Sequence, residues 1–461
     1  MAQPVRAQKY MSTFGRFKQV WLISWPLIVA NSFWNLQVTI DRIFLGSFSI
    51  DSLGAAIGAV GLFWAPMALV QQTASYVTTF VAQYLGKDEP QWIGPSLWQS
   101  IYVSIVGGIL FLLLIPMAPL LFQWVGHSPA LQILEVDYFQ MLAYSALPTA
   151  LVASASGFFT GLGRSRVIIL INLVGLLCNV LFDYLLIFGN CGFPRLGIAG
   201  AGLATAMANL GAAFFGFYLV FSSANKAKYR LTENWKVDWE IMFRFIKFGV
   251  PSGMQWALEG LAFTGFLVSI GRLPNGDVAL SASGITITIM MLAILPALGV
   301  AQGVSVLVGQ SLGRDEPNLA RTYTWVGFQM TLLYTLTMGL SFVVAPQLYI
   351  QMFQNTENME QWVQVSQLVP HLLIFVALFL AFDSLNLIFS FTLKGAGDTR
   401  YVSLVALLLP WPVMVFPAWY VSGWSSGVYW SWGFASLYIL LQAVVFLRRF
   451  LAGAWESMRV T

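Results

Sequence analysis

Long runs of apolar residues, broken by short polar segments, fill almost the whole of this chain of 461 residues. A membrane-spanning helix needs roughly 20 apolar residues, so the pattern predicts about twelve spans joined by short connections. Several runs are longer than about 25 residues, which predicts tilted or bent helices. The predicted spans are residues 18–45, 53–85, 97–122, 134–160, 167–188, 198–222, 245–270, 278–312, 321–345, 364–393, 401–422 and 428–448.

Prolines lie inside five of the predicted spans, where each removes a backbone hydrogen bond and can bend its helix. They are Pro26, Pro66, Pro148, Pro251 and Pro296. The polar segment before the first span is followed by an apolar run too long for a signal peptide and without a small-residue cleavage pattern. We therefore expect the first run to be a retained helix.

Composition agrees with this pattern, because 58% of the residues are hydrophobic and only 9% are charged. Soluble domains have about 25% charged residues. The fold class we predict is an all-α integral membrane protein. With two cysteines and two histidines in the sequence, a metal site of the His/Cys kind is not expected.

Lysines and arginines orient the predicted spans. If the N-terminus is cytoplasmic, all 23 of them except Arg42, Arg195 and Arg272 lie on the cytoplasmic side, including Arg6 and Lys9. This is the distribution that the positive-inside rule requires. We interpret the net charge of +4 as a sign of membrane orientation and not of nucleic-acid binding, and we expect both termini in the cytoplasm.

The chain contains an internal repeat. Residues 83–90 (QYLGKDEP) match residues 310–317 (QSLGRDEP), and residues 161–166 (GLGRSR) match residues 395–400 (GAGDTR). Pro26 and Pro251 correspond at nearly the same separation. Halves with six helices each have the same orientation in the membrane and are related by a pseudo-twofold axis along its normal, a common plan for alternating-access transporters. The predicted parts are an N-terminal lobe at 1–222, a cytoplasmic linker at 223–243 and a C-terminal lobe at 244–461.

Four acidic residues lie well inside predicted spans, and each is a candidate functional residue. A charged side chain near the bilayer centre costs several kcal/mol, so an acid there faces a cavity or a partner. The sequence places no lysine at matching depth, so we expect these acids to bind a cation or a proton. The alternative is a protonated acid that only forms hydrogen bonds between helices. The four are Asp41, Asp183, Glu259 and Asp383.

Polar neighbours of these acids add oxygen ligands of the kind that sodium prefers. Asn179 precedes Asp183 by four residues, which places both on one face of a helix. Thr205 lies in the sixth span, and Asn31, Asn35 and Gln37 lie in the first. Hydroxyls and amides in spans also bind helices together, and for Thr205 that interpretation remains open.

Several of these motifs together resemble the multidrug and toxic compound extrusion (MATE) family. They are residues 39–46 (TIDRIFLG), the paired Gly-Lys-Asp-Glu and Gly-Arg-Asp-Glu loops, and the paired Gly-x-Gly-x-x-Arg segments. The resemblance covers nearly the whole chain, including two lobes of six helices. It implies secondary active transport and no enzymatic activity.

The resemblance also implies roles for the acids. Glu259 in residues 255–259 (QWALE) and Asp383 in residues 382–386 (FDSLN) look like the C-terminal-lobe acids of the NorM-like branch, where they form a cation site facing a central cavity. Asp41, Asn179, Asp183 and Thr205 look like the N-terminal-lobe cation or proton site of the DinF-like and archaeal branches. This chain holds both sets, which departs from either pattern, and we favour the NorM-like branch.

The resulting hypothesis is an antiporter of the cytoplasmic (inner) membrane that exports cationic amphipathic drugs and dyes in exchange for H⁺ or Na⁺. It needs no cofactor, binds no nucleic acid, and is expected to work as a monomer in the lipid bilayer. Bending at Pro26 is the predicted hinge. The predicted substrate-binding residues are Asn35, Gln37, Asp41, Gln255, Glu259, Asp383 and Asn386.

Three other functions are compatible with parts of the pattern. A flippase for lipid-linked oligosaccharide or peptidoglycan precursors shares the two-lobe plan, but it requires cationic charge for pyrophosphate. A membrane-embedded enzyme would have to use His127, predicted in an outer loop, or His371. A channel is the third alternative. The chain has no phosphate-binding Gly-x-x-x-x-Gly-Lys-Ser/Thr loop, which argues against an ATP-driven pump.

Overall fold

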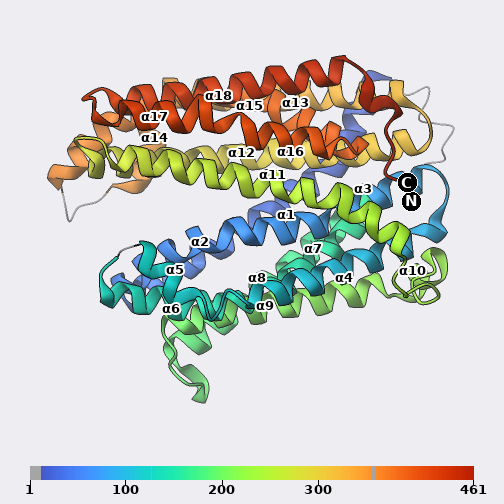
Figure 1. Ribbon diagram of the computed structural model, residues 1–461, viewed down its shortest axis with the longest axis horizontal. Helices are drawn as coiled ribbons and strands as arrows, with labels where there is room; N and C mark the ends of the chain where they lie inside the picture. The colour runs from blue at the N-terminus through green and yellow to red at the C-terminus, as the bar shows by residue number, and fades with distance from the viewer. Residues whose placement is uncertain (1–11, 126, 355–358) are drawn as a thin grey trace. The chain divides into compact units, whose positions relative to one another are not determined.

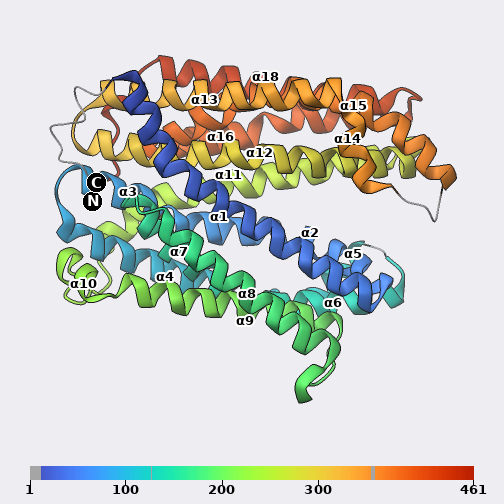
Figure 2. The same ribbon diagram turned by 180° about the vertical axis from the view of Figure 1, so that it is seen from behind.

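The computed structural model describes residues 12–125, 127–354 and 359–461, so Arg6 and Lys9 lie outside the described residues. Helices account for most of this part of the chain (Figures 1 and 2). The longer helices, in chain order, are α1 Thr13–Phe48, α2 Ile50–Ser75, α3 Val77–Gly86, α4 Ile93–Leu112, α5 Ala118–Val125, α6 Pro129–Ala143, α7 Ala146–Gly161, α8 Arg166–Phe188, α9 Ile198–Val220, α10 Ser223–Tyr229, α11 Trp239–Gly271, α12 Gly276–Gly313, α13 Pro317–Val344, α14 Pro346–Ile350, α15 Met359–Ala396, α16 Thr399–Leu408, α17 Phe416–Tyr420 and α18 Gly427–Leu451.

Nine of the described helical segments are long and apolar enough to cross a membrane, and the bent pair α6–α7 makes a tenth. Two further helices, α1 with 36 residues and α11 with 33, also have sufficient length. Both carry polar and acidic residues along their length, which lowers their hydropathy. The predicted spans 18–45 and 245–270 lie inside these two helices, so together the segments correspond to the twelve predicted spans.

The five predicted prolines all lie inside helices. Pro66 lies inside α2, Pro296 inside α12, and Pro26 and Pro251 inside α1 and α11. Pro148 lies in the first turn of α7, next to the break where the α6–α7 span bends by 42°. A proline inside a helix removes one backbone hydrogen bond, which makes a bend at that position easier, and the bend at the α6–α7 break lies beside Pro148.

The described chain divides into two compact units. The N-terminal unit comprises Val29–Ala257 with two short later segments, Gly309–Asp315 and Arg459–Thr461. The C-terminal unit comprises Leu258–Val308 and Glu316–Met458 together with the described residues up to Ile28. Each unit has its own core, and the unit boundary falls inside α1, α11 and α12.

In the N-terminal unit, α9 packs along α8, and α6 packs on both α9 and α2 (Figures 1 and 2). The core there includes Phe63, whose ring lies edge-on to Phe111 at 5.1 Å. Buried hydroxyls join α4 to α7, since the Oγ atoms of Ser100 and Ser154 lie 2.6 Å apart. Such hydroxyl contacts bind helices together in membrane proteins.

In the C-terminal unit, α13, α15 and α18 lie together in both views (Figures 1 and 2). Trp432 of α18 is buried against the edge of Phe266, with ring centroids 5.8 Å apart. Its indole N–H donates to Ser283 Oγ at 3.1 Å. Large apolar side chains remain exposed on both units, for example Leu333 (72%) and Phe214 (71%). Exposed apolar surface of this kind is suited to contact with lipid.

The repeated loops have the same backbone conformation. Asp88 and Asp315, equivalent in the two copies, both have positive φ, 59° and 56°. Within the N-terminal unit, the ends of α3 and α12 also approach each other reciprocally. A Cβ at Gly86 would overlap the carbonyl oxygen of Gln310, and a Cβ at Gly313 would overlap that of Gln83. Glycine at both positions therefore permits backbone contact between the two copies of the motif.

Replacing either glycine should destabilise the protein. We expect Gly86→Ala and Gly313→Ala each to lower stability by about 1–3 kcal/mol, because the new methyl group meets backbone and not a movable side chain. The measurement is the midpoint of thermal unfolding in detergent. Gly54→Ala is the control, since a Cβ there meets nothing within 4 Å. Equal midpoints for all three variants would contradict the close approach.

Candidate functional site

Two groups of acidic side chains form the candidate site, one in each unit. In the N-terminal unit, Asp41 comes from α1, and Asn179 and Asp183 come from one face of α8. Asp183 and Asn179 are fully buried, and Asp41 is 9% exposed. The carboxyl group of Asp41 lies within interaction range of the carboxyl group of Asp183 and of the Asn179 amide. The structure thus brings together three of the residues that the sequence analysis assigned to one cation or proton site.

Polar atoms in this group lack hydrogen-bond partners among the described residues. They include both carboxyl oxygens of Asp183, both side-chain polar atoms of Asn179 and Oδ1 of Asp41. Arg42 is exposed although its neighbour Asp41 is buried, as expected for adjacent positions on a helix. A buried carboxyl group with unsatisfied oxygens is destabilising unless it holds a proton or contacts a cation. The geometry therefore suits binding of a proton or a small cation.

Tyr138 of α6 belongs to the same group, although the sequence analysis did not identify it. Its side chain is buried and lies within electrostatic range of both Asp41 and Asp183. In the sequence it is one tyrosine among 16, with no spacing that connects it to either acid. Only the packing of α6 reveals the contact.

The other polar residues predicted around this group make local contacts. The hydroxyl of Thr205 donates to the Ala201 carbonyl oxygen one turn earlier in α9, at 3.1 Å. The side-chain amide of Asn35 donates to the Asn31 carbonyl oxygen at 3.3 Å, also within one helix. Gln37 is half-buried on α1. Their roles as ion or substrate ligands remain predictions.

In the C-terminal unit, each of the two candidate acids, Glu259 and Asp383, accepts a hydrogen bond from a side-chain amide. The Gln442 Nε2 of α18 donates to Glu259 Oε1 at 2.9 Å, so the pair joins α18 to α11. The Asn386 Nδ2 donates to Asp383 Oδ1 at 3.1 Å within α15. Glu259 and Asp383 lie within electrostatic range of each other. Gln255, which falls in the N-terminal unit, is buried one turn before Glu259 on α11.

One expectation about charge was wrong. The sequence analysis placed no lysine near the depth of the acids, yet Lys394 is buried and lies within electrostatic range of Glu259. Its Nζ also lies 3.8 Å from the centre of the Phe391 ring. Lys394 belongs to the last turn of α15, so its number along the chain suggested a solvated helix end. The ammonium group of a lysine can lie several ångströms along the helix surface from its own Cα, so the position of Lys394 in the sequence did not show where its charge lies.

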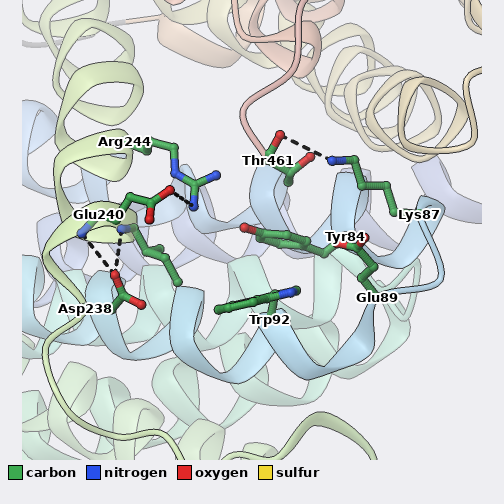
Figure 3. A pocket seen from close by; sticks show the side chains of 9 residues that line it. Tyr84, Lys87, Glu89, Trp92, Asp238, Glu240, Arg244 and Thr461 are labelled. Carbon is green, nitrogen blue, oxygen red and sulfur yellow. Dashed lines mark hydrogen bonds and ion pairs between the residues drawn. The ribbon is translucent and has the colours of Figure 1, made fainter.

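A separate pocket of about 260 Å³ lies in the N-terminal unit at the ends of α3 and α11 (Figure 3). The rings of Tyr84 and Trp92 stack in it at 6.5 Å. Arg244 forms an ion pair with Glu240 at 3.5 Å on its opposite side. None of the residues predicted to bind ion or substrate lines this pocket.

Comparison with known proteins identifies the class. The sequence profile of the MatE family matches residues 26–185 and again residues 251–419. The chain belongs to this family, so it is a multi-pass membrane transporter and not an enzyme. The two matched segments start at Pro26 and Pro251, one in each half of the chain, which confirms the internal repeat.

Individual relatives agree with this assignment. A probable multidrug resistance protein NorM of Mesorhizobium japonicum is 28% identical over 85% of this chain and 84% of its own length. A protein of the same name from Brucella suis is 27% identical over 85% of this chain and 83% of its own. These names agree with the predicted NorM-like branch.

Solved structures share the fold. A multidrug resistance MATE family transporter in an outward-facing conformation has a TM-score of 0.86 at 18% identity, covering 96% of this chain and 97% of that chain. A MOP superfamily transporter from Pyrococcus furiosus has a TM-score of 0.86 at 19% identity, with the same coverage of both chains. The predicted plan of twelve helices in two six-helix lobes is thereby confirmed. The residue boundaries predicted for the lobes and the linker remain a prediction.

The amide donor to Glu259 gives a stability test. We expect Gln442→Leu to lower the midpoint of thermal unfolding, equivalent to about 1–3 kcal/mol, because Glu259 Oε1 loses a buried donor. In a Glu259→Gln background, the same substitution should have a smaller effect, because the partner is no longer charged. An equal loss in both backgrounds would show that Gln442 contributes only packing.

Proposed function

We propose that this protein is a multidrug efflux antiporter that exports cationic amphipathic organic compounds in exchange for H⁺ or Na⁺. The observation that carries the proposal is the buried pair Asp41 and Asp183, whose unsatisfied oxygens suit a proton or a small cation. The names of the NorM relatives support multidrug efflux as the general activity.

The proposed mechanism is competition for carboxylates. A proton or sodium ion arriving from outside neutralises an acid that attracts the cationic substrate, and the substrate then leaves outward. Because the coupling free energy is reciprocal, bound substrate also weakens binding of the ion at the same acid. Asp41 in one unit, and Glu259 with Asp383 in the other, are the proposed shared carboxylates.

The two groups of acids differ in a way that bears on their roles. Glu259 and Asp383 each already accept a hydrogen bond from an amide, and Lys394 adds a positive charge near Glu259. Asp41 and Asp183 depend more on what they bind, because several of their oxygens have no donor among the described residues. We therefore favour the N-terminal group as a coupling-ion site.

Further residues complete the proposal. Asn35, Gln37, Gln255 and Asn386 are proposed to contact substrate. Pro26 is proposed as the hinge through which ion binding at Asp41 changes the shape of α1, since both residues lie on that helix. The protein is proposed to act as a monomer in the cytoplasmic membrane, with both termini in the cytoplasm.

The sign of the buried charge argues against a flippase of the same two-lobe plan. A pyrophosphate headgroup needs cationic partners, whereas acids dominate both candidate groups. The fold alone does not decide this question. The Pyrococcus furiosus transporter of the same fold is described as having a binding pocket of reverse polarity that suggests a different function.

Substitution of Asp41 tests the central role. We expect Asp41→Asn to abolish drug resistance in an efflux-deficient host, because the amide carries no negative charge to attract a cation and does not take up a proton. Membrane insertion should be unchanged, measured by the amount of protein in the membrane fraction. Asp51→Asn is the matched control, since Asp51 is an exposed acid in the first turn of α2. Undiminished resistance with Asp41→Asn would exclude the role.

The coupling ion can be tested in proteoliposomes with a fluorescent cation. If sodium is the coupling ion, a sodium pulse at fixed pH should drive substrate movement, and Asp183→Asn should remove the response. Loss of the response with Glu259→Gln and not with Asp183→Asn would instead assign the coupling ion to the C-terminal group. A response to pH jumps alone would favour protons. A matched choline pulse controls for ionic strength, and an equal response to choline would contradict sodium coupling.

A further inference from the structure

The N-terminal unit contains a further buried acid, Glu135 of α6, outside the groups described above. Its side chain is fully buried, and its Oε1 lies 2.7 Å from Nδ1 of His127. Its second oxygen, Oε2, is also buried and has no hydrogen-bond partner among the described residues. Gly58 of α2 faces the pair, and a Cβ there would overlap Glu135 Oε1. Glycine thus provides the space that the carboxyl group occupies.

His127 connects this buried carboxyl group to water. The imidazole side chain is 41% exposed and lies just before α6, in the connection that the charge distribution predicts to be on the outer face. The side-chain amide of Gln132 donates to the His127 carbonyl oxygen at 2.7 Å and holds this segment in place. One end of the pair therefore contacts solvent while the other is enclosed.

From Glu135, α6 leads toward the Asp41–Asp183 pair. Tyr138 follows Glu135 by three residues, which places both side chains on the same face of the helix. Tyr138 is itself buried within electrostatic range of Asp41 and Asp183. Tyr138 is thus the next titratable residue after Glu135 on this face of α6, on the way to the N-terminal carboxylates.

Arg42 of α1 lies within electrostatic range of Tyr138, but it is exposed and its guanidinium group keeps its proton in proteins. The other charged groups around α6 do not offer a competing path either. Asp137, on the same helix, and Asp51, at the start of α2, are both exposed. Helix α5 carries no titratable residue, and α9 carries only Tyr218, which is exposed near the opposite end of that helix. In this part of the chain, His127 is the ionisable group that directly contacts Glu135.

We propose that His127 and Glu135 form a proton entry site that supplies the Asp41–Asp183 pair from the outer face. His127 takes a proton from outer water at Nε2 and gives its Nδ1 proton to Glu135. The carboxyl group then passes one proton to the Tyr138 hydroxyl, which gives its own to Asp41 or Asp183. Each step moves one proton. Tyr138 ends with the protonation it began with, whereas the imidazole of His127 is left protonated at Nε2 and must return to the Nδ1–H tautomer by exchange with outer water before the next proton enters. This inference rests on the proposed function with H⁺ as the coupling ion.

Inside-out membrane vesicles provide the test, because their lumen corresponds to the outer face. With the lumen acidified by respiration, added substrate should release luminal protons, followed with acridine orange. We expect Glu135→Gln and His127→Gln each to slow this release about tenfold, since a positioned proton-transfer group typically contributes at least this much. The rate should also lose its dependence on luminal pH. Substrate binding to detergent-purified protein should stay unchanged.

Matched variants separate proton transfer from a structural role. Gly58→Ala displaces the carboxyl group of Glu135 but keeps both titratable residues, so it should also slow proton release. Gln132→Ala removes the loop contact without removing a titratable group and should retain the normal rate, as should Asp137→Asn and His371→Gln. A loss with Gln132→Ala equal to that with Glu135→Gln would show that the pair only anchors the loop.

The outcomes also separate this proposal from the proposed function. If the unmodified protein releases no luminal protons on addition of substrate, proton coupling itself is wrong, and the entry site is overturned with it. If the unmodified protein does so and Asp41→Asn does not, the proposed function holds. An unchanged rate and pH profile in both Glu135→Gln and His127→Gln would then overturn the entry site alone.

Discussion

The cost of burying a carboxylate in hydrocarbon is the constraint on which this structure depends. An acid at the centre of a spanning helix costs about 2.5–3.5 kcal/mol in membrane insertion. Asp41, Asp183 and Asp383 are nevertheless buried, and so is Glu135. Each must be stabilised by a hydrogen-bond donor, a cation or a proton. The way in which each acid is stabilised distinguishes structural polar groups from groups that exchange ions.

By this criterion the two units use different chemistry. In the C-terminal unit, Gln442 and Asn386 donate to Glu259 and Asp383, which reduces the need for a bound ion. In the N-terminal unit, Asp183 has no donor for either oxygen among the described residues. In the proposed mechanism, the free energy released when a proton or sodium ion binds there drives the change in conformation. A buried carboxyl group of Asp183 without hydrogen-bond donors is therefore consistent with ion-driven transport.

The internal repeat accounts for the shared backbone geometry of the two halves but not for the positions of their buried acids. The two copies share the proline of the first helix, the glycine at the end of the second span and an aspartate with positive φ in the loop that follows. These residues determine the backbone conformation, which is the same in both copies. The acids do not repeat at equivalent positions, because each unit stabilises its charges with different neighbours.

The sequence alone determined the membrane class, the spans, the repeat and the candidate acids, because hydropathy, basic residues and buried charge follow from local composition. It also placed Asn179 and Asp183 on one face of α8, since that needs only helical periodicity. It did not reveal Tyr138 or Gln442, because their contacts join helices distant along the chain. It did not reveal the pair formed by His127 and Glu135 either, because the path of the loop before α6 does not follow from helical periodicity. It also misplaced the charge of Lys394, whose position near a helix end suggested water. Which oxygens remain unsatisfied is decided only by packing in three dimensions, and that property defines the candidate ion site.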